Sequence, residues 1–240
     1  MVDQFVIVGG GLAGAIAAQT LREEGFAGRI TMVCGEPHRP YERPPLSKAY
    51  LAGTDDRESV FVHPSSWYAE HDVTLLTGVR ATAIDRAAHT VAMTDGTTLP
   101  YSKLLLATGS TPRQLPVPGS DLDGVLTLRT LADSDRLAPR LVAGARVVIV
   151  GGGWIGLEVA AAARLANADV TVVETTALPL QRVLGREVAQ IFVDLHKANG
   201  VHVVTRQSVQ ELRGERHVEA VVLSDGTALP ADVVVIGIGV

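Results

Sequence analysis

The chain contains the glycine-rich stretch Gly9-Gly10-Gly11-Leu12-Ala13-Gly14 and repeats its G-x-G-x-x-G pattern at Gly151-Gly152-Gly153-Trp154-Ile155-Gly156. The first glycine of such a motif permits a tight turn from a strand into a helix, the second lets a pyrophosphate approach the backbone, and the third lets the helix pack on the strand. Phosphates then lie at the helix N-terminus, where free N–H groups favour negative charge. Two copies indicate two dinucleotide sites if each lies between a strand and a helix and is followed by an acid.

The first copy has these surroundings. The β-branched run 5–8 precedes it and predicts a buried strand, and the Ala- and Leu-rich stretch 12–22 follows it and predicts a helix. Glu36 lies 22 residues after Gly14, beyond the next predicted strand. A carboxylate at that place accepts hydrogen bonds from ribose hydroxyls, the alternative being a solvated acid at a strand end.

The second copy repeats the arrangement. It lies between the apolar run 147–150 and the helix-forming stretch 157–166, and Glu174 follows Gly156 by 18 residues. Because an acid at this place repels a 2′-phosphate and accepts from a 2′-hydroxyl, the sequence predicts a preference for NADH over NADPH.

A second internal repeat supports two similarly built domains. Asp95-Gly96-Thr97-Thr98-Leu99-Pro100 is echoed by Asp225-Gly226-Thr227-Ala228-Leu229-Pro230, and each turn leads into an apolar strand whose closing glycine lies 14 positions after the aspartate. We expect an α/β protein with two Rossmann-like dinucleotide-binding domains and β-meander insertions. The expected divisions are 1–110, a connector at 111–144, and 145–240.

Composition narrows the function. With 240 residues, 47% hydrophobic and 20% charged, the chain is typical of a globular protein, and its net charge of −5 gives no case for binding nucleic acid or a membrane. The apolar run 5–21 lacks a basic leader, which predicts a cytoplasmic protein. Cys34 is the only cysteine, so a C-x-x-C redox pair is impossible, and the seven histidines show no metal-ligand spacing, so no metal site is expected.

The sequence resembles the FAD-dependent, NADH-using ferredoxin reductases of bacterial oxygenase and P450 systems. These putidaredoxin- and rubredoxin-reductase-like proteins belong to the glutathione-reductase-like flavoproteins. The block at 43–48 is the most specific mark, because disulfide reductases place a redox cysteine in that region. The motifs that carry the resemblance are Gly9-x-Gly11-x-x-Gly14, Arg43-Pro44-Pro45-Leu46-Ser47-Lys48, Ala107-Thr108-Gly109-Ser110, Gly151-Gly152-Gly153-Trp154-Ile155-Gly156 and Gly237-Ile238-Gly239.

The resemblance implies two glutathione-reductase-type domains that bind FAD and NADH. It also implies hydride transfer from NADH to FAD, followed by single-electron transfer to a ferredoxin-type 2Fe–2S protein. The residues that it assigns to FAD are Gly9, Gly11, Ala13, Gly14, Glu36, Arg43, Lys48, Val79, Arg80, Thr108 and Gly109. Those that it assigns to NADH are Gly151, Gly153, Ile155, Gly156, Glu174 and Gly237.

Lys48, Glu158 and Trp154 are the candidate catalytic residues. Glu158 lies in the first turn of the second predicted helix, where Ile16 holds the matching place in the first, so the fold does not require an acid there. We expect Glu158 to pair with Lys48 across the cleft between the domains, the alternative being an acid favoured by the helix dipole. Trp154 is expected to stack at the flavin until nicotinamide displaces it, the alternative being simple packing between domains.

The ferredoxin reductases continue beyond the equivalent of Val240, with a segment that returns to the FAD domain and an interface domain, so the chain is expected to be a C-terminally truncated form. Two other functions stay open. One is an NAD(H)-binding fragment or redox-sensing module without catalysis. The other is a related NADH oxidase or nitrite-reductase-type reducing module.

Overall fold

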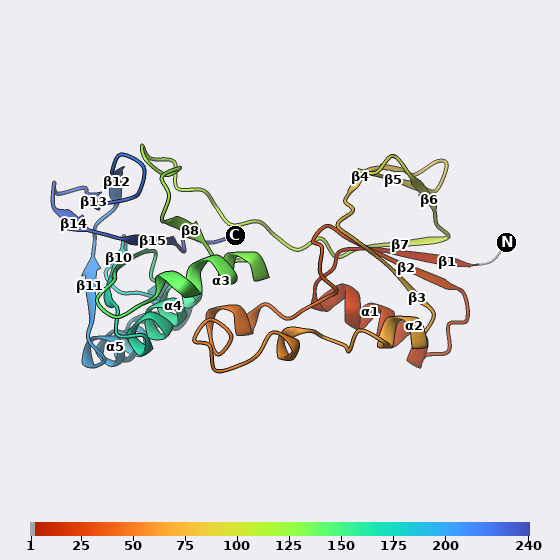
Figure 1. Cartoon of the computed structure of the whole chain (residues 1–240), viewed down its shortest axis with the longest axis horizontal. Coiled ribbons are helices and arrows are strands. Elements are labelled where there is room, and N and C mark those ends of the chain that lie inside the picture. The colour runs from red at the N-terminus through yellow and green to blue at the C-terminus, as the bar shows by residue number, and fades with distance from the viewer. Residues whose placement is uncertain (1–2) are drawn as a thin grey trace. The chain divides into compact units, whose positions relative to one another are not determined.

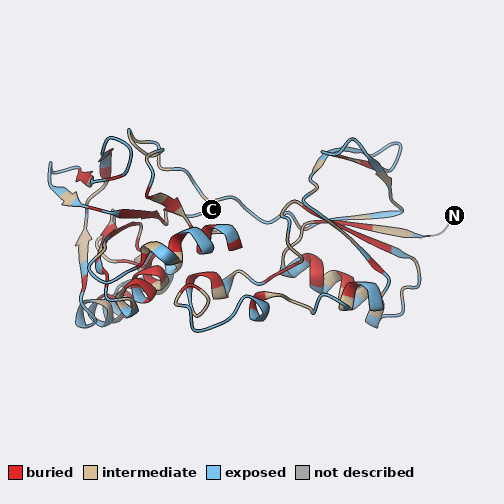
Figure 2. Cartoon of the chain, viewed as in Figure 1, coloured by how far each residue is buried: buried red, intermediate tan, exposed pale blue. Residues whose placement is uncertain are grey.

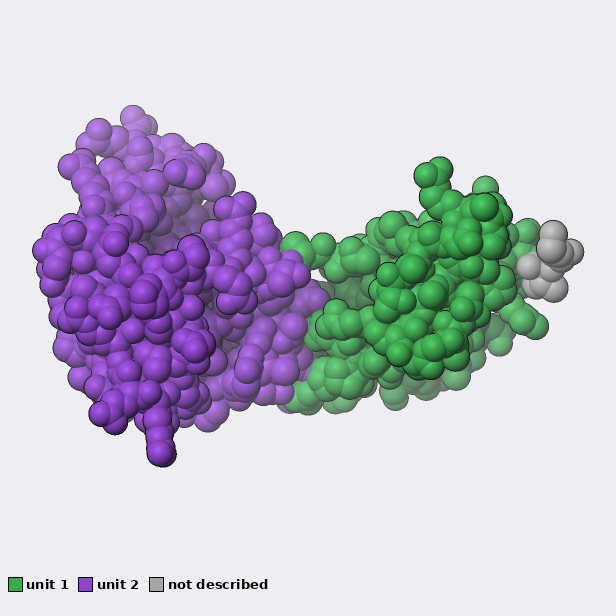
Figure 3. Space-filling model, turned by 90° about the horizontal axis from the view of Figure 1, so that it is seen from above, with its two compact units in different colours: residues 1–42, 57–110 green, residues 43–56, 111–240 purple. Residues whose placement is uncertain are grey.

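A computed structural model describes residues 3–240 and divides the chain into two compact units. Of the described residues, unit 1 comprises 3–42 and 57–110, and unit 2 comprises 43–56 and 111–240 (Figure 3). None of the helices within residues 3–240 is long and apolar enough to span a membrane.

Unit 1 is built on a four-stranded parallel sheet of order β3-β2-β1-β7. Helices lie on one face of this sheet and a three-stranded antiparallel meander lies on the other (Figure 1). The sheet strands are β1 (Gln4–Val8), β2 (Arg29–Cys34), β3 (Val73–Thr77) and β7 (Lys103–Leu106), the helices α1 (Leu12–Glu23), η2 (Glu58–Val60) and α2 (Trp67–Glu70), and the meander strands β4 (Ala81–Asp85), β5 (Thr90–Met93) and β6 (Thr98–Pro100).

The alternation of side chains along β1 explains these layers. Ile7 packs into a cluster with Ala18 of α1, whereas Val6 and Val8 pack with Val91 of the meander. Since successive side chains of a strand point to opposite faces, an uninterrupted apolar run is buried only when both faces are covered.

Unit 2 repeats this design with one more strand, in a five-stranded parallel sheet of order β11-β10-β9-β15-β8. Its sheet strands are β8 (Val125–Thr127), β9 (Arg146–Val150), β10 (Asp169–Glu174), β11 (Val201–Thr205) and β15 (Val233–Ile236). The helices are η1 (Pro44–Ser47), α3 (Leu131–Leu137), η3 (Ala138–Arg140), α4 (Trp154–Leu165) and α5 (Gln181–Ala198), and the meander strands are β12 (Val209–Arg213), β13 (Ala220–Leu223) and β14 (Ala228–Pro230).

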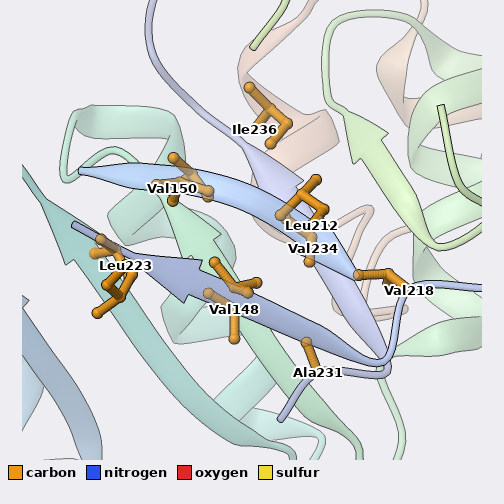
Figure 4. Packing of buried hydrophobic residues seen from close by; sticks show 11 residues of the cluster. Val148, Val150, Leu212, Val218, Leu223, Ala231, Val234 and Ile236 are labelled. Carbon is orange, nitrogen blue, oxygen red and sulfur yellow. The ribbon is translucent and has the colours of Figure 1, made fainter. Parts of the chain in front are cut away.

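One part of the core of unit 2 lies between the sheet and the meander. Val148 of β9 and Val234 of β15 pack with Leu212 of β12 and Leu223 of β13 (Figure 4). Every residue of β15 is buried, because β9 and β8 flank it and the meander covers it (Figure 2). In unit 1 the corresponding strand β7 is at the edge of its sheet, and its Leu106 is exposed.

The structure departs from the expected division at residues 43–56. Sequence order placed this segment with residues 1–110, but it packs within unit 2. Leu46 is buried there, and its carbonyl oxygen accepts a hydrogen bond of 2.9 Å from the buried hydroxyl of Ser134 in α3. Tertiary packing on α3 therefore determines which unit the segment joins.

The expected connector at 111–144 also contributes to unit 2. Within it, β8 pairs in parallel with β15, and α3 begins after a capping box formed by Thr130 and Asp133. A strand of three residues carries too little periodicity to be recognised in the sequence. The longest helix of this unit, α5, begins at Gln181 and passes a kink at Gly185.

Candidate nucleotide-binding sites

The second glycine turn has the shape that the motif requires. Gly151 has a φ of +104°, and a Cβ atom on it would lie 2.4 Å from the carbonyl oxygen of Gly237. Gly156 is buried beneath the turn, where a Cβ atom would lie 2.2 Å from the carbonyl oxygen of Gly151. Gly153 differs, because a Cβ atom on it would meet only the Gly237 oxygen, at 3.8 Å. Two glycines therefore shape the backbone, and Gly153 leaves space in front of the helix N-terminus.

Glu174 ends β10 beside this turn. Its carboxylate accepts hydrogen bonds from the backbone N–H groups of Gly152 and Thr176, both at 2.8 Å, and from the hydroxyls of Thr176 and Thr175 at 2.9 and 3.2 Å. Burial alone would raise the pKa of Glu174, but these hydrogen bonds outweigh it and hold the pKa below its usual value. The acid is therefore ionised at neutral pH and fixed in place.

A pocket of about 650 Å³ opens over this turn within unit 2. It brings together five of the six residues assigned to NADH from the sequence, while Gly156 lies beneath the turn rather than in the wall. The five are Gly151, Gly153, Ile155, Glu174 and Gly237. Gln181 of α5 also lines the pocket, although the sequence offered no motif that would have identified it.

Lys48 and Glu158 form the expected ion pair, with 2.8 Å between Nζ and Oε1. The hydroxyl of Ser47 donates to the other carboxylate oxygen of Glu158 at 2.5 Å. The expectation that the pair crosses between the domains is corrected, because the segment that carries Lys48 belongs to unit 2. The Lys48 side chain is 51% exposed and that of Glu158 is 27% exposed, so the ammonium group stays accessible.

Trp154 is the first residue of α4 and lines the pocket. Trp154 is 45% exposed. Its ring packs edge-on against that of Phe192, with 5.6 Å between the ring centroids and 88° between the ring planes. Phe192 belongs to α5, so only the tertiary packing identifies it as the support of the indole. An exposed, one-sided aromatic ring can stack against a planar ligand.

The first glycine turn in unit 1 has the same geometry. Gly9 has a φ of +137°, and a Cβ atom on it would lie 2.0 Å from the carbonyl oxygen of Ala107. A Cβ atom on Gly14 would lie 2.4 Å from the Gly9 oxygen, whereas one on Gly11 would meet no atom within 4 Å. Ala13 is exposed in the first turn of α1. The open space again lies at a helix N-terminus.

The wall beside this turn is formed by residues that follow β2. Val8 is paired with Val33 in unit 1 as Val150 is with Val173 in unit 2, so the counterpart of Glu174 is Cys34 and not Glu36. Glu36 lies two residues further on, where Oε2 accepts a hydrogen bond of 2.5 Å from the hydroxyl of Tyr41. The two acids therefore occupy different places in their turns.

Two more of the expected FAD residues, Val79 and Arg80, lie beside the same strand end. The backbone N–H of Val79 donates to the carbonyl oxygen of Cys34 at 3.2 Å, and Arg80 Cγ would lie 3.1 Å from a Cβ atom on Gly35. Cys34 itself is buried, and burial together with the charge of Glu36 raises the pKa of its thiol to about 12. The thiol is therefore not a redox nucleophile.

The remaining expected residues divide between the units. Thr108 and Gly109 follow β7, and the backbone nitrogen of Thr108 lies 3.2 Å from the Cβ position of Gly9. Arg43 belongs to unit 2, where its guanidinium donates to the carbonyl oxygen of Arg129. Among residues 3–240 no group of three or more His, Cys, Asp or Glu side chains could hold a metal ion.

Comparison with known proteins places nearly the whole chain in one protein family. The family model for pyridine nucleotide-disulphide oxidoreductases matches residues 3–240. Rhodocoxin reductase of Rhodococcus erythropolis is 43% identical over 237 residues, which are 98% of this chain and 56% of that protein. Putidaredoxin reductase of Pseudomonas putida is 42% identical over 243 residues, which are 99% of this chain and 58% of the relative.

Solved structures agree with these relatives. The covalent putidaredoxin reductase–putidaredoxin complex matches with a TM-score of 0.96 and 42% identity, over 99% of this chain and 58% of the other. An NAD-dependent persulfide reductase from A. fulgidus matches with a TM-score of 0.91 and 29% identity, over 98% of this chain and 46% of the other. The chain therefore spans a little over half the length of the curated relatives that it matches.

Proposed function

We propose that this chain, which belongs to the pyridine nucleotide-disulphide oxidoreductase family, acts as an FAD-dependent NADH:ferredoxin reductase. The observation that carries the proposal is the pair of glycine turns, each of which leaves open space at a helix N-terminus. Unit 1 would hold FAD and unit 2 would hold NADH. Bound FAD would supply the chemistry that turns a two-electron hydride donor into a one-electron reductant.

Unit 1 fits a flavin dinucleotide at its phosphates. Gly11 faces space that a Cβ atom would enter, and its backbone φ of −100° is one that any residue can adopt, so the fold itself does not require a glycine there. The need for a glycine is explained if a pyrophosphate approaches the backbone. Glu36, held by Tyr41, would receive hydroxyl donors of the same cofactor.

Unit 2 fits NADH. The N-terminus of α4 offers free N–H groups to the pyrophosphate, and the fixed, ionised Glu174 accepts from ribose hydroxyls. A 2′-phosphate would meet this carboxylate as a like charge, which favours NADH over NADPH.

Three side chains of unit 2 are candidates to act near the reacting groups. Lys48 would place a positive charge beside the flavin. Glu158 holds that ammonium group in position, and the hydroxyl of Ser47 in turn donates to the Glu158 carboxylate. Trp154 would cover the nicotinamide position, supported on one side by Phe192. Their contribution is position and electrostatics rather than proton transfer.

A ferredoxin-type 2Fe–2S protein that serves an oxygenase or a P450 is the proposed electron acceptor. The support is the relatives, among them a biphenyl dioxygenase system ferredoxin–NAD(+) reductase component of Paraburkholderia xenovorans that is 42% identical. We place the reaction in the cytoplasm, where NADH is supplied. Cell fractionation with an antibody against the chain tests that placement.

One spectroscopic experiment tests the proposal. The purified chain is reconstituted with FAD, its visible spectrum is recorded, and NADH is added under anaerobic conditions. We expect flavin absorbance that NADH bleaches, followed by reoxidation when a 2Fe–2S ferredoxin is supplied. A colourless chain that still binds NADH contradicts a reductase and favours the non-catalytic nucleotide-binding module. Bleaching that only oxygen reverses favours an NADH oxidase.

A further inference from the structure

Gln181 carries a polar atom that the protein leaves unsatisfied. Its side-chain oxygen Oε1 is buried and has no hydrogen-bond partner among the described residues. The residue is the first of α5, and it lines the pocket that also holds Glu174 and the second glycine turn. A buried acceptor without a donor destabilises the fold. In a binding pocket, the missing donor can be supplied by a bound molecule.

The backbone around Gly152 explains why Gln181 stands close to this turn. The N–H of Gly152 donates to Glu174 at 2.8 Å, and its carbonyl oxygen accepts from the N–H of Leu180 at 3.1 Å. Leu180 is buried and has a φ of +59°, an uncommon conformation for a non-glycine residue. The chain is thus brought back to the glycine turn in the residue directly before Gln181, and Gln181 and Glu174 line the same pocket.

We infer that Gln181 is a further recognition residue of unit 2, whose side-chain oxygen accepts a hydrogen bond from a hydroxyl of the adenosine ribose. The inference rests on the proposed function, since it takes NADH as the ligand. Glu174 and Gln181 both present acceptors, so this end of the pocket suits hydroxyl groups, which can donate. A phosphate carries only acceptors at neutral pH, so it could pair neither with the Gln181 side-chain oxygen nor with the Glu174 carboxylate.

The test uses the whole chain and measures dissociation constants from nicotinamide fluorescence. The ligands are NADH and two NADH analogues that lack the 2′- or the 3′-hydroxyl of the adenosine ribose. Gln181→Met removes the acceptor and keeps the length of the side chain. Gln190→Met is the matched control, because Gln190 lies further along α5, where its amide donates to Asp194 at 2.8 Å.

We expect Gln181→Met to weaken NADH binding about fivefold, the effect of one lost hydrogen bond. The same substitution should leave unchanged the affinity for the analogue that lacks the recognised hydroxyl, which shows that the variant is folded. Gln190→Met should bind all three ligands as the parent does.

Three results overturn the inference. If Gln181→Met binds NADH as tightly as the parent, or loses the same factor for NADH and both analogues, the side chain does not recognise a hydroxyl. If the parent chain binds no nicotinamide nucleotide at all, the proposed function fails first, and the inference fails with it.

Discussion

Gly151 and Gly153 stand two residues apart in one turn, and the structure predicts opposite results for their replacement by alanine. Gly151 has a φ of +104°, and the added Cβ atom would lie 2.4 Å from a backbone oxygen that cannot move aside easily. Gly153 has a φ of −78° and a ψ of −178°, and its Cβ atom would have no protein atom closer than 3.8 Å.

The magnitudes follow from these geometries. A non-glycine residue held in a rare backbone conformation costs about 1–3 kcal/mol, and the contact with Gly237 adds to it, so Gly151→Ala should lower the free energy of unfolding of unit 2 by about 3 kcal/mol. At a permitted φ, replacing glycine by alanine restricts the unfolded chain, so Gly153→Ala should raise the same free energy by about 0.5 kcal/mol. Its methyl group would nevertheless occupy the space proposed for the pyrophosphate, and NADH affinity should fall at least about tenfold.

The two tryptophans make the assay specific to a unit. Trp67 lies in unit 1 and Trp154 in unit 2, so a Trp67→Phe background leaves Trp154 as the only indole reporter. Urea unfolding followed by its fluorescence gives the stability of unit 2, and calorimetry gives the NADH affinity. The reasoning is refuted if Gly151→Ala unfolds at the same urea concentration as the parent, or if Gly153→Ala binds NADH with parental affinity.

Three further predictions concern side chains of unit 2. Glu158→Gln breaks a partly exposed ion pair with Lys48, so stability should change by less than about 1 kcal/mol, while stopped-flow flavin reduction by NADH should slow about tenfold; an unchanged rate would exclude a positioning role. Trp154→Ala should change nicotinamide affinity or the rate of flavin reduction, and a titration in which both match the parent would leave the indole with packing alone. Hydrogen bonds from Arg146 lower the pKa of Asp232 from 3.8 to about 2. The contribution of Asp232 to the stability of the folded state is therefore present above pH 4 and is lost as the pH falls towards 2. Asp232→Asn should therefore lower the urea midpoint slightly at pH 7 and not at pH 2, and an equal shift at both pH values would contradict this.

The local architecture could be predicted from the sequence. Each glycine turn was placed correctly between its strand and its helix, because a tight turn with positive φ needs a glycine whatever the rest of the chain does. The repeated Asp-Gly turns were likewise expected, since the signal lies in adjacent residues, and the structure places them between β5 and β6 and between β13 and β14. The acid of the first unit was harder to place, because Glu36 lies two positions beyond the residue that matches Glu174, and the strand register shows this offset.

By itself, the sequence determined that two strand–turn–helix units exist and that each presents a helix N-terminus to open space, because these features depend on glycines and on residues close to them in the chain. Tertiary structure alone decided which unit holds Lys48, which side chain supports Trp154, and where Gln181 leaves an acceptor unsatisfied. Those outcomes depend on contacts between segments far apart in the chain. The energies that select such contacts come from burial and hydrogen bonding in the folded state, which no local pattern records.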